Sequence, residues 1–434
     1  MTAPPAPTAP PAPPKQPPPP VQARIRVRTP ARTAGCTISA DGSYAARLAR
    51  AAGSPDAWYP ERWTLGSAEP YAVPLPGNQP EEPSTEVLPM ADGRVLVHRV
   101  AGERHVFTLL YPTGPGTGEV PLGAVECGEL SLLPPAPGGT RAYAVAPGTR
   151  SSDIWLVAGG AFGPEHLAAV PGRCSGGVWL GGTDRMLALD RELDGRTKTV
   201  AVDLERGGEV SPLLQIAEDS DDRLLLADAD SGLLLIRSDA PGDSRLGWGV
   251  LGGTRPVRFP ESLRLPDLTV TPFAIQPGQV LTPEACGVAL RIDAPGPADP
   301  AGARSWLGLW RPAARQVQQL AAPAGWLTGS GWWTRDGELC LPYATGAAPC
   351  GVARVKGPAA PAVAPTVAPP PGPPADSPTD PPAADTPLDS PAAEAPRDDV
   401  PPASPPPSPD PPKPSATRPV PLQQAPLGGR TAGG

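Results

Sequence analysis

The chain has 434 residues, 70 of them proline, and 36 Lys plus Arg stand against 44 Asp plus Glu, for a formal charge of −8. A protein that neutralises nucleic-acid phosphates needs a basic surface, so this balance argues against a nucleic-acid partner. So many prolines do not suit one evenly folded body, and we expect folded and unfolded parts.

Proline and alanine dominate both ends of the chain. Residues 1–21 and 356–434 hold no aromatic and few β-branched side chains, so they cannot bury enough apolar surface to offset the entropy of ordering. We predict a disordered Pro-rich arm over 1–21, a folded region over 22–355 and a disordered Pro/Ala-rich tail over 356–434. The tail favours a stiff spacer, with docking or phosphorylation at its Ser-Pro sites as the alternative.

The first residues, MTAPPAPTAPPAPPKQPPPP, lack the apolar segment of a signal peptide. No later run approaches the roughly 18 apolar residues of a membrane span. We therefore expect a cytoplasmic protein without a membrane partner. The excess of Arg, Ala, Pro and Gly is typical of high-GC bacteria such as actinobacteria, and six cysteines without CxxC spacing fit buried apolar side chains in a reducing compartment.

A turn signature recurs along the folded region at intervals of 44 to 59 residues. It occurs at Asp41-Gly42, Asp92-Gly93, Gly138-Gly139, Gly182-Thr183, Ser231-Gly232, Pro277-Gly278 and Asp336-Gly337. Fixed periods of this length indicate a repeat architecture. Helical repeats are excluded because the runs between turns are short and β-rich, with no sustained 3.6-residue period.

The predicted strands group in fours along the chain. The second unit reads TEVLPMA, RVLVHRV, HVFTLLYP and EVPLGAV, the third GELSLLPP, TRAYAVAP, SDIWLVAGG and EHLAAV, and the fourth GGVWLGG, RMLALDRE, TKTVAVDLE and EVSPLLQI. Four antiparallel strands in about 45 residues match one blade of a β-propeller. The last unit, GSGWWTRD, ELCLPYAT and CGVARV, lacks a fourth strand, whereas VQARIRVRT from Val21 has no hairpin partner. We predict that residues 22–29 complete the last of seven blades and close the ring.

The phrases SADGSYAARL, MADGRVLVHR and TRDGELCLPY resemble the repeats of WD40-like and TolB-like β-propellers. The resemblance continues at the third strand, with DIWLVAGG and TVAVDLERGG, and it covers the whole folded region. It concerns the general repeat and no particular subfamily. It implies an all-β, seven-bladed propeller of four-stranded antiparallel blades, and a scaffold that usually binds partners.

Candidate catalytic and metal-binding residues are few. His98, His105 and His166 fall in only two blades, so we expect surface or strand-end residues in preference to a metal triad or catalytic group. Asp228 and Asp230 in LLADADSG lack the spacing of a calcium loop, which favours a polar turn between the first two strands of blade five. We predict no catalytic residue, no metal and no cofactor.

Loops that join consecutive blades of a propeller lie on the same face as loops that join second and third strands. Here they carry many carboxylates, at Glu81, Glu82, Glu86, Glu218, Asp219, Asp221, Asp222, Glu261 and Asp267. We predict that this face binds a basic protein or peptide, because charge complementarity speeds and selects association. Solvated loops that serve solubility are the alternative.

Two adjacent tryptophans, Trp332 and Trp333, complete the set of candidate residues. Neighbouring residues of a strand point to opposite faces, so both rings pack between blades if the sheet is covered on both sides. The alternative is that one ring anchors a partner at the mouth of the channel.

The predicted function is that of a non-catalytic, monomeric interaction scaffold. A propeller hydrolase or lyase with a channel site is one alternative, and a small-ligand sensor is another. An enzyme would need at least three polar residues from different blades meeting near the axis.

Overall fold

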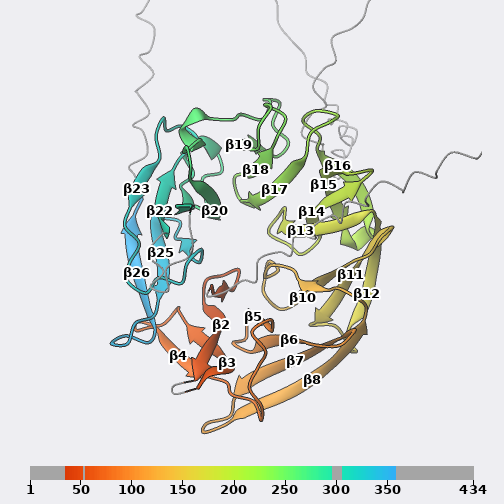
Figure 1. Cartoon of the computed structure of the whole chain (residues 1–434), viewed down its shortest axis with the longest axis vertical. Helices are drawn as coiled ribbons and strands as arrows, with labels where there is room; N and C mark the ends of the chain where they lie inside the picture. The colour runs from red at the N-terminus through yellow and green to blue at the C-terminus, as the bar shows by residue number, and fades with distance from the viewer. Residues whose placement is uncertain (1–34, 52–53, 296–304, 358–434) are drawn as a thin grey trace, which may run out of the picture.

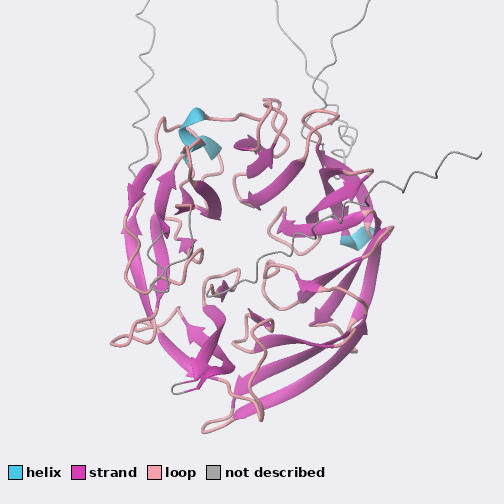
Figure 2. Cartoon of the chain, in the orientation of Figure 1, coloured by secondary structure: helices cyan, strands magenta, loops and turns pink. Residues whose placement is uncertain are grey.

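A computed structural model describes residues 35–51, 54–295 and 305–357. Over these residues the chain forms seven antiparallel sheets around a common axis, as the blades of a propeller (Figure 1). Strands make up nearly all of the regular structure (Figure 2). The predicted all-β, seven-bladed propeller is confirmed. None of the helices in the described ranges is long and apolar enough to cross a membrane.

Five blades have four strands each. Blade one contains β1 (Thr37–Ile38), β2 (Tyr44–Ala51), β3 (Ser54–Thr64) and β4 (Tyr71–Pro74). Blade two contains β5 (Glu86–Pro89), β6 (Val95–Ala101), β7 (Arg104–Pro112) and β8 (Thr117–Glu126). Blade three contains β9 (Ser131–Leu132), β10 (Ala142–Pro147), β11 (Ser151–Ala158) and β12 (Glu165–Pro171). Blade four contains β13 (Arg173–Trp179), β14 (Met186–Leu193), β15 (Arg196–Asp203) and β16 (Glu209–Leu214), and blade six contains β20 (Thr269–Ile275), β21 (Val288–Asp293), β22 (Ser305–Trp310) and β23 (Gln318–Leu320).

Blades five and seven have three strands each within the described residues. Blade five contains β17 (Asp222–Ala227), β18 (Leu233–Ser238) and β19 (Arg245–Val250), and blade seven contains β24 (Trp332–Trp333), β25 (Glu338–Tyr343) and β26 (Gly351–Lys356). In blade five a bridge takes the place of the fourth strand, where Trp248 and Arg258 exchange two backbone hydrogen bonds of 2.9 Å. The predicted closing strand 22–29, the arm 1–21 and the tail beyond residue 357 lie outside the described residues.

Short 3-10 helices lie in three connections. They are η1 (Leu204–Arg206), η2 (Glu261–Leu263) and η3 (Pro283–Ala285). η2 lies in the connection from blade five to blade six.

The recurring turn signature marks the connection between the first and second strands of each blade. Gly42 and Gly93 adopt φ angles of 73° and 79°, a region that favours glycine. A Cβ at Gly42 would lie 3.2 Å from Nε1 of Trp332 in blade seven, and a Cβ at Gly93 would lie 3.1 Å from the ring of Tyr44 in blade one. Glycine is therefore needed at these two turns both for the backbone and for the close approach of the preceding blade.

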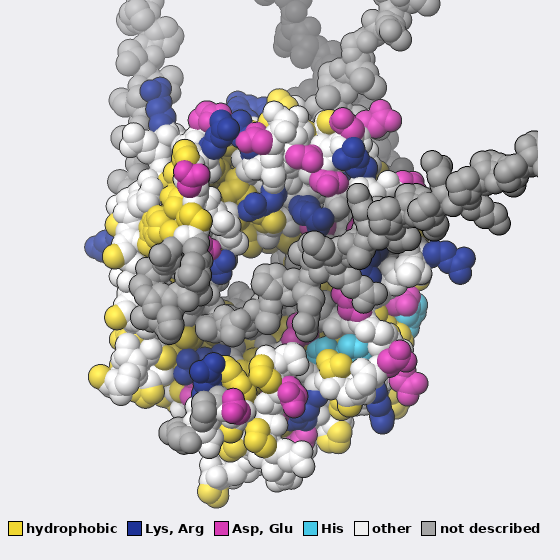
Figure 3. All heavy atoms as spheres, in the orientation of Figure 1, with side chains coloured by type: hydrophobic (Ala, Val, Ile, Leu, Met, Phe, Trp, Pro, Cys, Tyr) yellow, Lys and Arg dark blue, Asp and Glu magenta, His cyan; other side chains and the backbone are white. Residues whose placement is uncertain are grey.

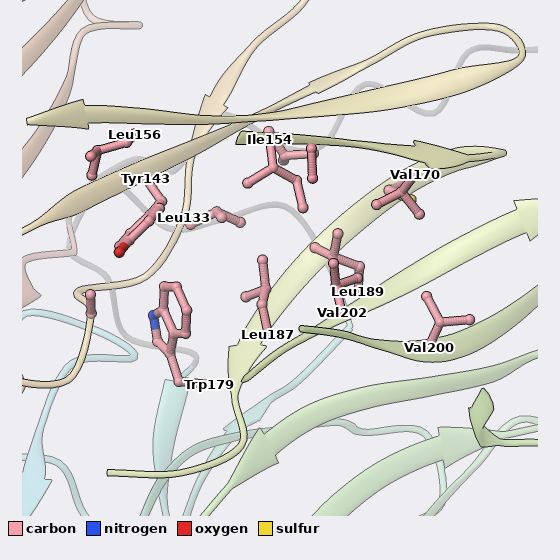
Figure 4. Close-up of a cluster of buried hydrophobic side chains, with 14 residues drawn as sticks. Leu133, Tyr143, Ile154, Leu156, Val170, Trp179, Leu187, Leu189, Val200 and Val202 are labelled. Atoms are coloured by element: carbon pink, nitrogen blue, oxygen red, sulfur yellow. The ribbon is translucent and has the colours of Figure 1, made fainter. Parts of the chain in front are cut away.

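Apolar cores lie between neighbouring blades. Figure 4 shows the core between blades three and four, with side chains from both sheets pointing toward one another. Its labelled members are Leu133, Tyr143, Ile154, Leu156 and Val170 from blade three, and Trp179, Leu187, Leu189, Val200 and Val202 from blade four. A sheet exposes apolar side chains on both faces and cannot bury them alone, so each blade is stabilised by its two neighbours.

Blades one and seven meet directly. The backbone N–H of Cys36 donates to Oγ of Ser330 at 2.9 Å, and that hydroxyl donates to the carbonyl oxygen of Cys36 at 2.9 Å. Trp63 of blade one packs in one apolar cluster with Leu327 and Trp332, which belong to the segment that forms blade seven. The ring is therefore closed within the described residues.

Polar side chains also bridge the other six junctions to the backbone of the next blade. The pairs are Arg62 with Gly93, Glu86 with Leu132, Ser152 with Cys174, Asp190 with Leu224, Arg237 with Val270 and Gln276 with Arg335. Hydrogen bonds are directional, so these contacts set how neighbouring sheets are aligned, whereas apolar packing supplies most of the stabilisation.

Candidate functional site

The two faces of the ring carry different loops. We call the face with the loops between blades and between second and third strands the connection face, and the opposite one the turn face. Segments 75–85, 215–221 and 259–268, which hold most of the predicted carboxylates, lie on the connection face. In the view of Figure 3, acidic and basic side chains are interspersed around the ring and form no continuous acidic surface.

Two of the predicted carboxylates are buried and cannot contact a partner, which corrects the expectation that they belong to an interaction surface. Glu81 is 6% exposed and pairs with Arg99, whose Nη2 lies 2.7 Å from Oε1. Asp222 is fully buried and pairs with Lys198, with 2.8 Å between Nζ and Oδ2. Both are buried because each is the counterion of a cation on a neighbouring strand, and both fasten their loops to a blade.

Two further carboxylates are half-buried and bind backbone groups. Oε2 of Glu86 accepts a hydrogen bond of 2.9 Å from the N–H of Leu132, which starts the next blade. Oδ1 of Asp221 accepts one of 2.8 Å from the N–H of Thr197. These two carboxylates therefore serve the alignment of neighbouring blades.

The remaining five predicted carboxylates are exposed: Glu82, Glu218, Asp219, Glu261 and Asp267. Glu261 pairs with Arg245 at 2.5 Å. In the described part of the chain, the other four have no ion pair. Glu82 directly follows the anchored Glu81, and Glu218 and Asp219 lie just before the anchored Asp222. Glu82, Glu218 and Asp219 are thus presented by loops that buried carboxylates hold in place.

The two tryptophans do not join this set. Trp333 is 4% exposed and packs with Leu339 and Leu341 of its own blade. Trp332 is half-buried in the cluster between blades seven and one, where it contacts the turn at Gly42 on the turn face. Both rings are used in packing, at a distance from the carboxylate-bearing loops.

Surface or strand-end positions were expected for the histidines; His98 and His105 are buried, at 2% and 3% exposure, and His105 lies near the start of β7. Nδ1 of His98 lies 2.9 Å from Oε2 of Glu86, and Nε2 of His98 lies 2.9 Å from Nδ1 of His105. Nε2 of His105 lies 3.1 Å from the carbonyl oxygen of Cys127. The two imidazoles and the carboxylate therefore form one hydrogen-bonded chain.

The chain of contacts assigns the protons. The carbonyl of Cys127 needs an N–H from Nε2 of His105, so Nδ1 of His105 accepts from Nε2 of His98. Nε2 of His98 is then a donor, and Nδ1 of His98 faces the carboxyl group of Glu86. Burial, followed by the electrostatic interaction with His98, lowers the pKa of His105.

The remaining candidates show ordinary structural roles. His166 is exposed and lies 3.0 Å from Oδ1 of Asp153, apart from the other two histidines. Asp228 accepts hydrogen bonds from the N–H and hydroxyl of Ser231, so the predicted polar turn is confirmed. Over the described ranges, no three His, Cys, Asp or Glu side chains come together as metal ligands would.

All six cysteines are free thiols. Cys174, Cys286 and Cys340 are buried as expected, and Cys36, Cys127 and Cys350 are half-buried. Burial raises the pKa of Cys36 to about 12 and that of Cys286 and Cys350 to about 11, so these thiols are poor nucleophiles near neutral pH.

No sequence pattern indicated the cavity of about 190 Å³ that opens on the connection face between blades five and six. Arg237, Arg245 and Arg264 line it together with Asp243. Its other lining residues are Ser244, Leu246, Pro260, Leu263, Leu265, Leu268, Thr269 and Val270. The sequence feature closest to an indication of this cavity is Arg237, which directly follows the apolar run LLLI and so places a guanidinium near the end of a buried strand.

These features define a seven-bladed β-propeller of no identified subfamily. No protein-family model matches the sequence, and no curated protein matches it. The chain is similar to the solved structure of a puromycin-hydrolysing peptidase of Mycobacterium tuberculosis, with 14% identity and a TM-score of 0.46 over 75% of this chain. It spans about half of that peptidase, 52% of its length.

Other similar structures come from different classes. An oligogalacturonate lyase from Vibrio parahaemolyticus shows 12% identity and a TM-score of 0.44, over 72% of this chain and 88% of the lyase. TolB from Acinetobacter baumannii shows 12% identity and a TM-score of 0.36, over 72% of this chain and 80% of TolB. TolB-like propellers are thus among the similar structures, and likenesses at this level carry no argument about activity.

Proposed function

We propose that the protein is a non-catalytic binding scaffold whose connection face captures a basic protein or peptide. The observation that carries the proposal is the pairing of buried and exposed carboxylates in the same loops. Glu81 and Asp222 fix their loops from inside, while Glu82, Glu218 and Asp219 point outward beside them. We further propose that the protein acts as a monomer in the cytoplasm.

The loop from blade four to blade five shows how this presentation works. Oδ2 of Asp222 accepts the N–H of Ile216 at 2.9 Å, and Oγ of Ser220 accepts the N–H of Ala217 at 3.1 Å. The segment between these contacts holds Glu218 and Asp219, both exposed. A loop ordered before binding loses less conformational entropy when a partner docks, so its charges contribute more to affinity.

The charges also favour a cationic partner. Within the described residues no cation lies within 4 Å of Glu82, Glu218, Asp219 or Asp267, and the whole chain carries a formal charge of −8. Exposed carboxylates of this kind attract a basic surface at long range and raise the association rate more than they slow dissociation.

The experiment uses the full chain and a fluorescent oligolysine peptide as the basic probe, with anisotropy measured at several salt concentrations. The variant is Glu218→Lys with Asp219→Lys. Reversal of Asp222 would be misleading, because it would bury two ammonium groups together. We expect affinity to fall about fivefold at low salt, and the difference to shrink as salt screens the charges.

The matched control is Glu69→Lys with Asp336→Lys, two exposed carboxylates on the turn face. It changes the net charge by the same amount. An equal loss of affinity in both double variants would mean that net charge alone attracts the probe, and the proposed face would be wrong. Unchanged affinity in the Glu218/Asp219 variant would refute it as well and would favour loops that serve solubility.

A further inference from the structure

Arg237 is the starting point for a second kind of site. It is the penultimate residue of β18, on the connection face and half-buried, and its Nη2 donates to the carbonyl oxygen of Val270 at 3.0 Å. Among the described residues no carboxylate lies within 4 Å of its guanidinium. Burial lowers the pKa of Arg237, and no neighbouring charge opposes that effect.

A half-buried guanidinium without a counterion is costly. Arginine carries five N–H donors in a fixed fork, and one backbone carbonyl satisfies only one of them. Burial of a charge is tolerated when the charge is paired and hydrogen-bonded. Two other half-buried cations on this face, Lys198 and Arg99, have their carboxylates in Asp222 and Glu81, whereas Arg237 lines an open cavity.

Two more arginines line the same cavity. Arg245 pairs with Glu261, which is 72% exposed, and Arg264 lies 3.6 Å from Asp243, which is 54% exposed. Ion pairs with such exposed carboxylates contribute little to stability, so either guanidinium can exchange its carboxylate for another anion. Three arginines and one aspartate leave the cavity wall with an excess of positive charge.

The walls and the volume restrict what fits. Leu246, Leu263 and Val270 are 5 to 7% exposed and form apolar walls, which strengthen electrostatic attraction inside the cavity. A volume of about 190 Å³ is below the roughly 300 Å³ at which sites for drug-sized ligands begin. The space suits a group the size of a phosphate or a carboxylate, and planar guanidinium forks match the paired oxygens of both.

We infer that the cavity between blades five and six is a binding site for a small oxyanion, a carboxylate or phosphate group, held by Arg237 with help from Arg245 and Arg264. The anion would supply the counterion that Arg237 lacks. This site is independent of the basic partner proposed above, because it does not use the loops that present Glu82, Glu218 and Asp219.

The test is calorimetric titration of the full chain with inorganic phosphate and, separately, with acetate, at constant ionic strength set with chloride. We expect saturable binding of one equivalent of at least one anion, and the tighter one identifies the group. Arg237→Gln should weaken binding about tenfold or more, because it removes a charge-assisted hydrogen-bonding fork. Arg255→Gln, on the turn face and paired with Glu284, should leave it unchanged.

Glu261→Gln tests the site through a gain of affinity, which damage to the fold would not cause. It releases Arg245 from its carboxylate, so anion binding should become tighter, by about threefold. Absence of saturable binding of both anions would overturn the inference, as would equal affinity in the wild type and Arg237→Gln. If Arg237→Gln fails to fold, Arg264→Gln on the exposed rim replaces it, with a smaller expected loss and the same interpretation.

Discussion

The junction between blades three and four and the junction between blades four and five hold neighbouring sheets together by different means. The first is an apolar core in which Leu187, Leu189 and Val200 are fully buried. The second has an apolar core too, but it adds ion pairs with buried carboxylates at its connection-face end, where Lys198 meets Asp222 and Arg223 lies 3.7 Å from Asp190. Apolar packing tolerates small shifts, whereas the charged contacts permit one alignment.

The junction with the charged contacts is also the one next to exposed carboxylates. The polar junction lies directly below the loop that presents Glu218 and Asp219, and the apolar junction carries no such loop. Buried ion pairs recover the cost of desolvation only when their geometry and hydrogen bonds are complete. Three variants test this contrast and a fourth tests the histidine pair of blade two, in order of decreasing expected effect.

Asp222→Ala should cause the largest loss. It leaves Lys198, whose side chain is 15% exposed, without its counterion, and we expect about 4 kcal/mol less free energy of unfolding in urea. Asp219→Ala, three residues earlier and exposed, should change stability by less than about 0.5 kcal/mol. Similar values for the two variants would show that the buried pair does not stabilise the junction.

Leu187→Ala should weaken the apolar junction by about 3 kcal/mol, from lost burial and the cavity left behind. The control is Leu193→Ala on the same strand, where the side chain is 48% exposed and the loss should be small. If both variants lost the same free energy in urea unfolding, the core between blades three and four would not be the source of stability.

Asp190 should act against stability near neutral pH. Burial raises its pKa from 3.8 to about 6, although Thr199 and the N–H of Leu224 donate to it. A carboxyl whose pKa is raised by folding stabilises the protein most below pH 4, and this contribution is lost as pH rises through 6. Asp190→Asn should therefore be about 2 kcal/mol more stable than the wild type at pH 7. The advantage should vanish near pH 4, and an advantage independent of pH would contradict the assigned cause.

His105 should show the opposite slope and the smallest effect. Folding lowers its pKa, so its neutral form stabilises the protein above pH 6.5, and that contribution is lost as pH falls below this value. In His105→Gln this dependence should disappear, because an amide can still donate to the carbonyl of Cys127 without titrating. Thermal unfolding midpoints between pH 5 and 8 provide the measurement, and parallel curves for the two proteins would refute the assignment.

The repeat could be predicted from the sequence because its signal is local. Asp-Gly turns and alternating strands fix the blade count, and these turns stand between first and second strands as the structure shows. The histidine pair was also accessible in principle. A tight turn at Gly102 pairs His98 with Phe107, which makes His98 and His105 diagonal neighbours on one face of the hairpin.

The burial of individual loop carboxylates could not be predicted in the same way. Asp222 is buried because Lys198, 24 residues earlier, reaches it from the neighbouring blade, and Arg99 reaches Glu81 from the next blade along the chain. Asp219 and Asp222 look alike in the sequence and differ only through such contacts. The arginine-lined cavity was missed for the same reason, since it needs residues from two blades and their connection.

The contact between Cys36 and Ser330 has a mechanical consequence. In the described residues, six junctions are crossed by the polypeptide as well as by side chains, and the one between blades seven and one is held by noncovalent contacts alone. Over the described residues, this junction can therefore open while every sheet stays intact. Amide protons of Cys36 and its neighbours should be the first of the interior to exchange with solvent, long before the protein melts.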